Sequence, residues 1–81
     1  MPKKKKGTDY VKNFCNLNVL LPWGEFVRIL KKVYGFEMKS KPGSARLFIK
    51  GEIRFTAHEP HARESYVSKE DRKRACRFTQ D

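Results

Sequence analysis

The chain has 81 residues, of which 38% are hydrophobic and 35% charged, and its 19 Lys and Arg against 9 Asp and Glu give a formal net charge of +10. This length allows one domain with a modest core, and no stretch approaches the roughly 18 apolar residues of a membrane span. The positive charge favours an anionic partner, first nucleic acid and next an acidic protein or a membrane surface, although a basic surface can also simply keep a protein soluble.

The two cysteines, Cys15 and Cys76, form no Cys-x-x-Cys pair, so the sequence predicts no zinc site. The basic start has no apolar segment behind it and is therefore not a signal peptide. Because nothing indicates secretion, we expect a reducing, cytoplasmic location in which each cysteine is a small buried apolar residue. A disulfide between them stays open as an alternative. No metal or cofactor is expected.

The first residues form no part of the predicted core. Residues 3–6 are four consecutive lysines that repel one another, so we expect residues 1–8 to be a mobile basic arm, either a solvated tail or a nonspecific phosphate contact. Residues 9–81 are expected to form the single domain. Residues 9–21 follow neither the helical nor the strand period, which predicts a loosely packed segment with a short helical turn at 10–14.

Two helices are predicted. The first begins at Pro22, where the missing N–H does no harm, and ends at Gly35, a typical residue after a helix. Its apolar face follows the helical spacing through Trp23, Phe26, Val27, Leu30, Val33 and Tyr34. The second begins at Ser68, which starts a capping box that ends at Asp71. It has a thin apolar face, and its basic residues are either a solvated face or a second phosphate contact.

Between the helices, residues 35–57 predict three short antiparallel strands joined by tight turns at Pro42-Gly43 and Gly51-Glu52. The fold class is therefore α+β, in the order α-β-β-β-α, with two helices packed on one face of a three-stranded antiparallel sheet. Alternation predicts a helix-facing side made of Phe36, Met38, Ala45, Leu47, Ile49, Ile53, Phe55 and Ala57. It predicts an outer face that carries Lys39, Arg46, Lys50 and Arg54 around an exposed Phe48.

This outer face is a candidate nucleic-acid surface. Basic side chains around an aromatic ring suit RNA, because phosphates meet the charges and a base can stack on the ring. The alternative is an ordinary solvated sheet face whose lysines discourage aggregation at the edges.

The histidines His58 and His61 lie in residues 58–67, which we expect to be a loop. Histidine is the side chain best suited to move protons near neutral pH, so the pair are the acid–base candidates of the chain. Without further ligands their spacing is a weak metal signal, and a structural role in closing the loop is the alternative.

Short motifs stand in a characteristic order over residues 24–77: Glu25 to Lys32, Gly35-Phe36-Glu37, Gly43-Ser44, Pro60-His61 and the helix from Ser68. Together they resemble the HicA family of toxin–antitoxin ribonucleases. The resemblance implies a fold like that of a double-stranded RNA-binding domain and translation-independent cleavage of messenger RNA. It also implies a HicB-like antitoxin protein as the neutralising partner.

One position departs from the family. The catalytic histidine normally follows the Gly-Ser pair, and here that position is Ala45, whose methyl group cannot transfer a proton. Three explanations stay open: a natural variant that retained RNA binding, an acid–base role moved to His58 or His61, or a deliberate replacement of histidine by alanine.

The expected RNA contacts follow from charge, the aromatic ring and the resemblance: Lys39, Lys41, Ser44, Arg46, Phe48, Lys50, Arg54 and Arg63. Arg46, Arg54 or Arg63 would clamp the phosphate in any cleavage. The alternative function is a non-catalytic basic module that binds an acidic protein.

Overall fold

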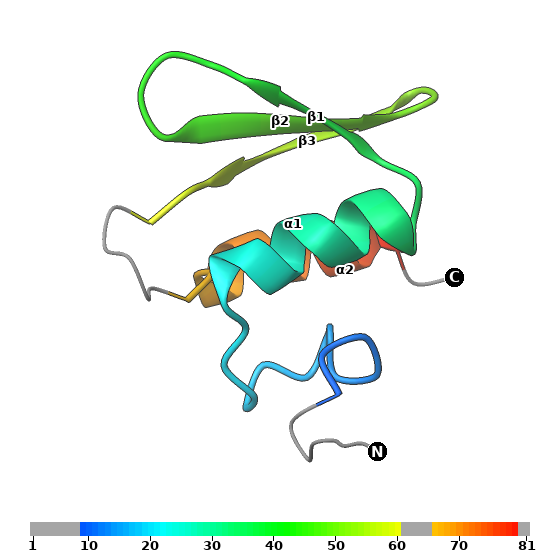
Figure 1. The fold of residues 1–81 in the computed structure, drawn as a ribbon, viewed down its shortest axis with the longest axis vertical. Coiled ribbons are helices and arrows are strands. Elements are labelled where there is room, and N and C mark those ends of the chain that lie inside the picture. The colour runs from blue at the N-terminus through cyan, green and yellow to red at the C-terminus, as the bar shows by residue number, and fades with distance from the viewer. Residues whose placement is uncertain (1–8, 61–65, 80–81) are drawn as a thin grey trace, which may run out of the picture.

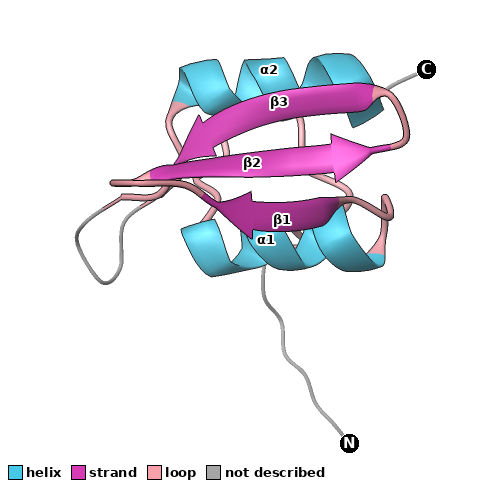
Figure 2. Cartoon of the chain, turned by 90° about the horizontal axis from the view of Figure 1, so that it is seen from above, coloured by secondary structure: helices cyan, strands magenta, loops and turns pink. Residues whose placement is uncertain are grey.

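Two helices and a three-stranded sheet make up the domain (Figure 1). The computed structural model describes residues 9–60 and 66–79, and the element order is α1 (Trp23–Lys32), β1 (Glu37–Ser40), β2 (Ala45–Lys50), β3 (Ile53–His58) and α2 (Lys69–Thr79). The strands form one antiparallel sheet in the order β1-β2-β3. Both helices lie on one face of it, with α1 behind β1 and α2 behind β3 in Figure 2.

The predicted α+β class and the α-β-β-β-α layout are therefore confirmed. The predicted basic arm, residues 1–8, lies outside the described residues. Within the described ranges, no helix has the length and apolar character needed to cross a membrane.

Local residue chemistry sets the end of α1 and the turns of the sheet. Gly35 has a φ of 80°, which lets the chain reverse after the helix so that the Phe36 N–H donates to the Leu30 carbonyl (2.8 Å). Gly51 has a φ of 61° in the tight turn between β2 and β3. In α1, Phe26 and Leu30 are buried as predicted, but Val33, the C-cap residue, is 48% exposed.

The predicted faces of β2 are wrong, because the strand is turned by one residue relative to the prediction. Lys50 pairs with Ile53 across the Gly51-Glu52 turn, and directly opposed residues share a face of the sheet. Phe48 is consequently opposite Phe55 on the helix-facing side and is 0% exposed. Arg46 and Lys50 share that side, whereas Ala45, Leu47 and Ile49 lie on the outer face.

An aromatic cluster fills the space between sheet and helices. Phe48 stacks on Phe55, with ring centroids 5.3 Å apart, and meets Phe26 of α1 edge-on at 5.7 Å. Phe26 also stacks on Phe14 at 5.7 Å, and Phe55 stacks on Phe78 of α2 at 5.7 Å. One cluster thus joins the N-terminal segment, both helices and the sheet, which explains why the register that buries Phe48 is preferred.

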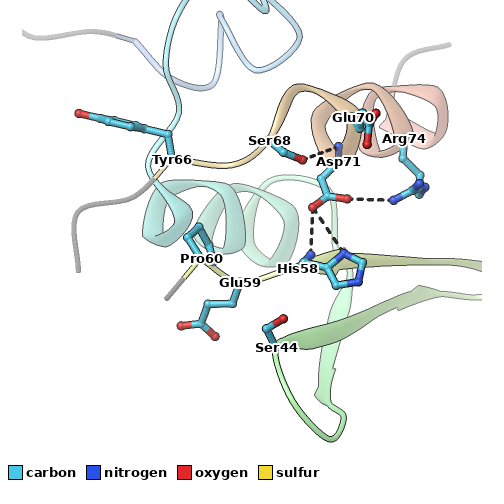
Figure 3. A pocket seen from close by; sticks show the side chains of 9 residues that line it. All are labelled: Ser44, His58, Glu59, Pro60, Tyr66, Ser68, Glu70, Asp71 and Arg74. Atoms are coloured by element: carbon cyan, nitrogen blue, oxygen red, sulfur yellow. Dashed lines mark hydrogen bonds and ion pairs between the residues drawn. The ribbon is translucent and has the colours of Figure 1, made fainter. Parts of the chain in front are cut away.

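The start of α2 is anchored to the end of β3 through Asp71. The Asp71 N–H donates to Ser68 Oγ (3.1 Å), as the predicted cap requires. The Asp71 carboxylate does not return to the cap residue. One oxygen accepts the backbone N–H of His58 (3.0 Å), and the other accepts from Arg74 (2.9 Å) (Figure 3). Arg74 also donates to the Thr56 carbonyl (3.0 Å), so helix and strand are joined twice.

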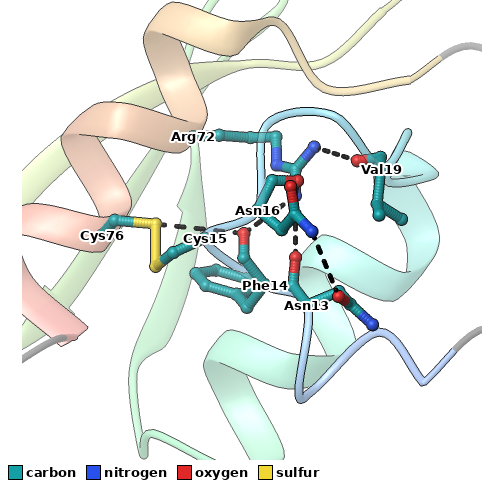
Figure 4. The surroundings of a disulfide bond; sticks show 7 residues. All are labelled: Asn13, Phe14, Cys15, Asn16, Val19, Arg72 and Cys76. Atoms are coloured by element: carbon teal, nitrogen blue, oxygen red, sulfur yellow. Dashed lines mark hydrogen bonds between the residues drawn. A yellow bond between two sulfur atoms is a disulfide. The ribbon is translucent and has the colours of Figure 1, made fainter.

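The N-terminal segment, residues 9–21, packs against α2. It contains the predicted helical turn, in which the Asn13 N–H donates to the Asp9 carbonyl (3.0 Å), and it contributes Phe14 to the core. A disulfide joins Cys15 to Cys76 of α2 (Figure 4). The expectation of two separate apolar cysteines is therefore wrong, because the segment folds back and brings them together across 61 residues of sequence.

Arg72 holds the same segment from inside. It is 2% exposed, and its guanidinium donates to the carbonyls of Asn13 (3.0 Å), Phe14 (2.9 Å) and Asn16 (2.9 Å), and to that of Val19 (Figure 4). Burial lowers the pKa of Arg72. Four carbonyl dipoles oppose this effect because they favour the charged form. Arg72 is therefore a structural residue, in contrast to the solvated or phosphate-binding role expected for the basic residues of this helix.

Candidate functional site

The candidate site lies at the end of the sheet where β2 begins and β3 ends. Ala45 and His58 are direct cross-strand partners there. The Glu59 N–H donates to the Ser44 carbonyl (2.8 Å), which extends the pairing one residue beyond the strands. His58 is therefore the last residue of β3, and the prediction that placed it in a loop is wrong; His61 lies outside the described residues.

A cleft of about 390 Å³ opens beside these residues (Figure 3). The side chains that line it come from the β1–β2 turn, from the end of β3 and from the first turns of α2: Ser44, His58, Glu59, Pro60, Tyr66, Ser68, Glu70, Asp71 and Arg74. The His58 side chain is 63% exposed. Its Nδ1 lies 3.9 Å from the Asp71 carboxylate, which also holds its backbone N–H.

The electrostatics of the cleft are mixed. Glu59, Glu70 and Asp71 supply carboxylates, and Arg74 supplies a cation that is paired with Asp71 but remains about half exposed. An imidazole beside a fixed carboxylate can accept and return a proton. An exposed guanidinium can meet a phosphate in a bidentate fashion. The cleft thus combines the two kinds of group that phosphodiester chemistry requires.

Arg46 does not stand on the outer face with the predicted RNA contacts. Its guanidinium pairs with Glu59 (3.0 Å) and donates to the carbonyls of Gly43 (2.9 Å) and Ala45 (2.7 Å). Only 20% of its side chain is exposed. These bonds stabilise the turn before β2. The prediction that Arg46 lies on the outer face of the sheet and clamps a phosphate from there is therefore wrong.

Phe48 is the second correction among the predicted RNA contacts. Because it is completely buried, no base can stack on it. Lys50 also lies on the helix-facing side, at the end of β2, with its Nζ 5.7 Å from the centre of the Phe36 ring. The reason is the same for both residues: the β2–β3 turn fixes the register that the count of apolar residues did not reveal.

The remaining predicted contacts are divided between the outer face and the turn. Lys39 and Arg54 are exposed on the outer face, where they flank the half-buried Leu47 and Ile49. Lys41 is exposed in the β1–β2 turn, and Ser44 lies at the cleft. Arg63 lies outside the described residues.

Sequence reasoning gave little weight to a basic depression on α2. Glu70, Lys73, Arg74 and Arg77 line it, and Glu70 and Arg74 also line the cleft. The sequence spacing of these residues predicts that they share one face of the helix, since helical residues three or four apart lie side by side. Within residues 9–60 and 66–79, no group of three or more His, Cys, Asp and Glu side chains is placed to hold a metal ion.

A scan against models of known protein families, a search of curated proteins and a search of solved structures each found no match. The functional interpretation therefore rests on the residues of this chain.

Proposed function

We propose that the protein binds RNA as a HicA-like domain of ribonuclease lineage, in which Ala45 stands where the family has its catalytic histidine. The net charge of +10 and the order of the family-like motifs on an α-β-β-β-α fold support the proposal. The observation that carries it is a set of cations contributed by β3, an edge strand of the sheet, and by α2. We call it the β3–α2 row, and it consists of Arg54, Lys73, Arg74 and Arg77.

Arg74 connects the two elements of this row. Its bond to the Thr56 carbonyl brings the cations of α2 up to the strand that also carries Arg54. Arg54, Lys73 and Arg77 are exposed and form no ion pair with any described residue. Cations without a carboxylate partner keep their full capacity for phosphate oxygens. The row therefore replaces the ring of charges around Phe48 as the expected path of the RNA backbone.

The test is the salt dependence of binding to a single-stranded RNA. Each phosphate contact contributes a log–log slope of about −0.7. The double variant Lys73→Gln, Arg77→Gln should bind more weakly and lose about 0.7 of slope per broken contact. The matched control is Lys31→Gln, Lys32→Gln, which removes the same charge from the end of α1. Equal losses in the two double variants would refute a localised row and leave only nonspecific attraction.

The alternative function, a non-catalytic module for an acidic protein, predicts a flat or unmeasurable RNA titration. The partner that the resemblance implies is a HicB-like antitoxin, and we propose that its acidic surface would meet the same cations. We propose the cytoplasm as the site of action. Thiols there are kept reduced, so the Cys15–Cys76 pair would be exposed to reduction, and the Arg72 hydrogen bonds and the packing of Phe14 would hold the N-terminal segment.

A further inference from the structure

His58 combines an exposed ring with a fixed backbone. Its ring is 63% exposed at the cleft, while its backbone N–H is bound to a carboxylate that is itself buried. Asp71 is in turn held by Ser68 and Arg74. These bonds hold the backbone from which the His58 ring projects. A fixed backbone limits the positions that the ring can take, which favours a group that transfers protons.

The neighbouring Asp71 oxygen lies on the Nδ1 side of the imidazole, at 3.9 Å. This is longer than a hydrogen bond, as is common for catalytic contacts before a substrate closes the site. A carboxylate at this position favours the tautomer with hydrogen on Nδ1, which leaves Nε2 free to act as a base. Figure 3 shows the ring beside the cleft, between Ser44 and Asp71.

Space for a substrate lies beside the ring. The cross-strand partner of His58 is Ala45, and the side chains of directly opposed residues stand about 5 Å apart at Cβ. Ala45 carries only a methyl group, and the cleft of about 390 Å³ that His58 lines supplies the space. Arg74 lines the same cleft and remains about half exposed, so its guanidinium is accessible to a phosphate bound there.

We propose that His58 is the acid–base residue of a phosphodiester-transfer site in this cleft, with Arg74 as the phosphate contact and Asp71 as a positioning residue. This proposal rests on the proposed binding of RNA. His58 Nε2 takes the proton from a ribose 2′-hydroxyl, and the oxygen attacks the adjacent phosphorus. The bond from phosphorus to the 5′-oxygen breaks, and the imidazolium returns the proton to that oxygen. The products are a 2′,3′-cyclic phosphate and a 5′-hydroxyl, and no further reactant is consumed.

The test uses the purified full chain, a fluorescently labelled single-stranded RNA and the DNA of the same sequence. The RNA should be cleaved to a 2′,3′-cyclic phosphate end, and the DNA should stay intact because it lacks the attacking hydroxyl. His58→Ala should lower the rate about 10²–10⁴-fold, the usual contribution of a general acid–base group, without loss of RNA affinity. Imidazole added to His58→Ala should restore part of the rate, which a purely structural role would not allow.

Asp71→Asn tests the positioning role through the separation of kcat from KM. The expected result is a lower kcat with KM unchanged, in a variant whose melting curve shows that it is folded. The chain offers Glu52→Gln as a matched control, since it removes an exposed carboxylate from the β2–β3 turn, outside the cleft.

Three results would overturn the inference. The RNA could be bound but not cleaved, cleavage could survive in His58→Ala, or the cleavage lost in His58→Ala could fail to return when imidazole is added. The first leaves the proposed function intact and removes only the chemistry. Absence of RNA binding would remove both proposals together, so the two failures are distinguishable.

Discussion

The Cys15–Cys76 disulfide should contribute a large part of the stability of this small domain. It joins residues 61 apart in sequence. In the chain-entropy model, closing a loop of this length lowers the entropy of the unfolded chain enough to stabilise the fold by about 4 kcal/mol. For a domain of this size, each kcal/mol shifts the melting temperature by about 4–8 °C. Reduction, or the double variant Cys15→Ser, Cys76→Ser, should therefore lower the Tm by about 15–30 °C.

The fold itself should survive reduction. Arg72 still binds four carbonyls of the N-terminal segment, and Phe14 still stacks on Phe26. The measurement is thermal melting followed by circular dichroism, with and without reductant, together with thiol titration of the unreduced protein. The double Ser variant is the control, because reductant should not change its Tm. Equal melting temperatures and two reactive thiols before reduction would refute the disulfide and the magnitude derived from it.

Two further substitutions probe the fold and the lineage. Arg72→Met should destabilise the domain by about 3 kcal/mol or more, because it leaves buried carbonyls without donors. The control is Lys73→Met at the exposed neighbouring residue, which should change the free energy of unfolding by no more than about 0.5 kcal/mol. Urea unfolding of the two variants measures both values. Ala45→His should create or raise ribonuclease activity and arrest growth on induction, because residue 45 follows Gly43-Ser44 and faces His58; a folded but inert variant would contradict the proposed lineage.

The elements of the fold were predictable because their signals are local. Pro22 and Gly35 delimit α1, and the two Gly-containing turns delimit the strands, each through the backbone conformations that these residue types allow. Ser68 likewise caps α2 as expected. None of these predictions requires knowledge of what lies across the core.

The face of β2 was not predicted correctly because two apolar residues, Leu47 and Ile49, outnumber the single Phe48. The face of β2 is decided instead by the strand register and by the apolar area of one large side chain. Phe48 fills the aromatic cluster, and the turn at Gly51-Glu52 makes Lys50 pair with Ile53. A two-residue turn at Gly51-Glu52 places Lys50 and Ile53 on one face, and Phe48 lies on that face with them.

Arg72 and the disulfide could not be predicted, since both depend on contacts between residues more than 50 apart. In sequence, Arg72 looks like the other cations of α2. Its burial arises only because the turns at 9–21 present several carbonyls to one point. For the candidate site, the sequence indicated His58, but its partner Asp71 was interpreted only as a helix cap.

The double role of Asp71 determines how stability and activity should separate at this site. The carboxylate docks α2 onto β3 through the His58 backbone N–H, and the same oxygen lies beside the His58 ring. The ring itself makes no hydrogen bond with any described residue and is mostly exposed, so its removal should leave the melting temperature nearly unchanged. Removing the Asp71 charge should affect both docking and chemistry. A loss of activity without a loss of stability is therefore expected at His58 alone, and the same pattern at Asp71 would mean that helix docking does not depend on this carboxylate.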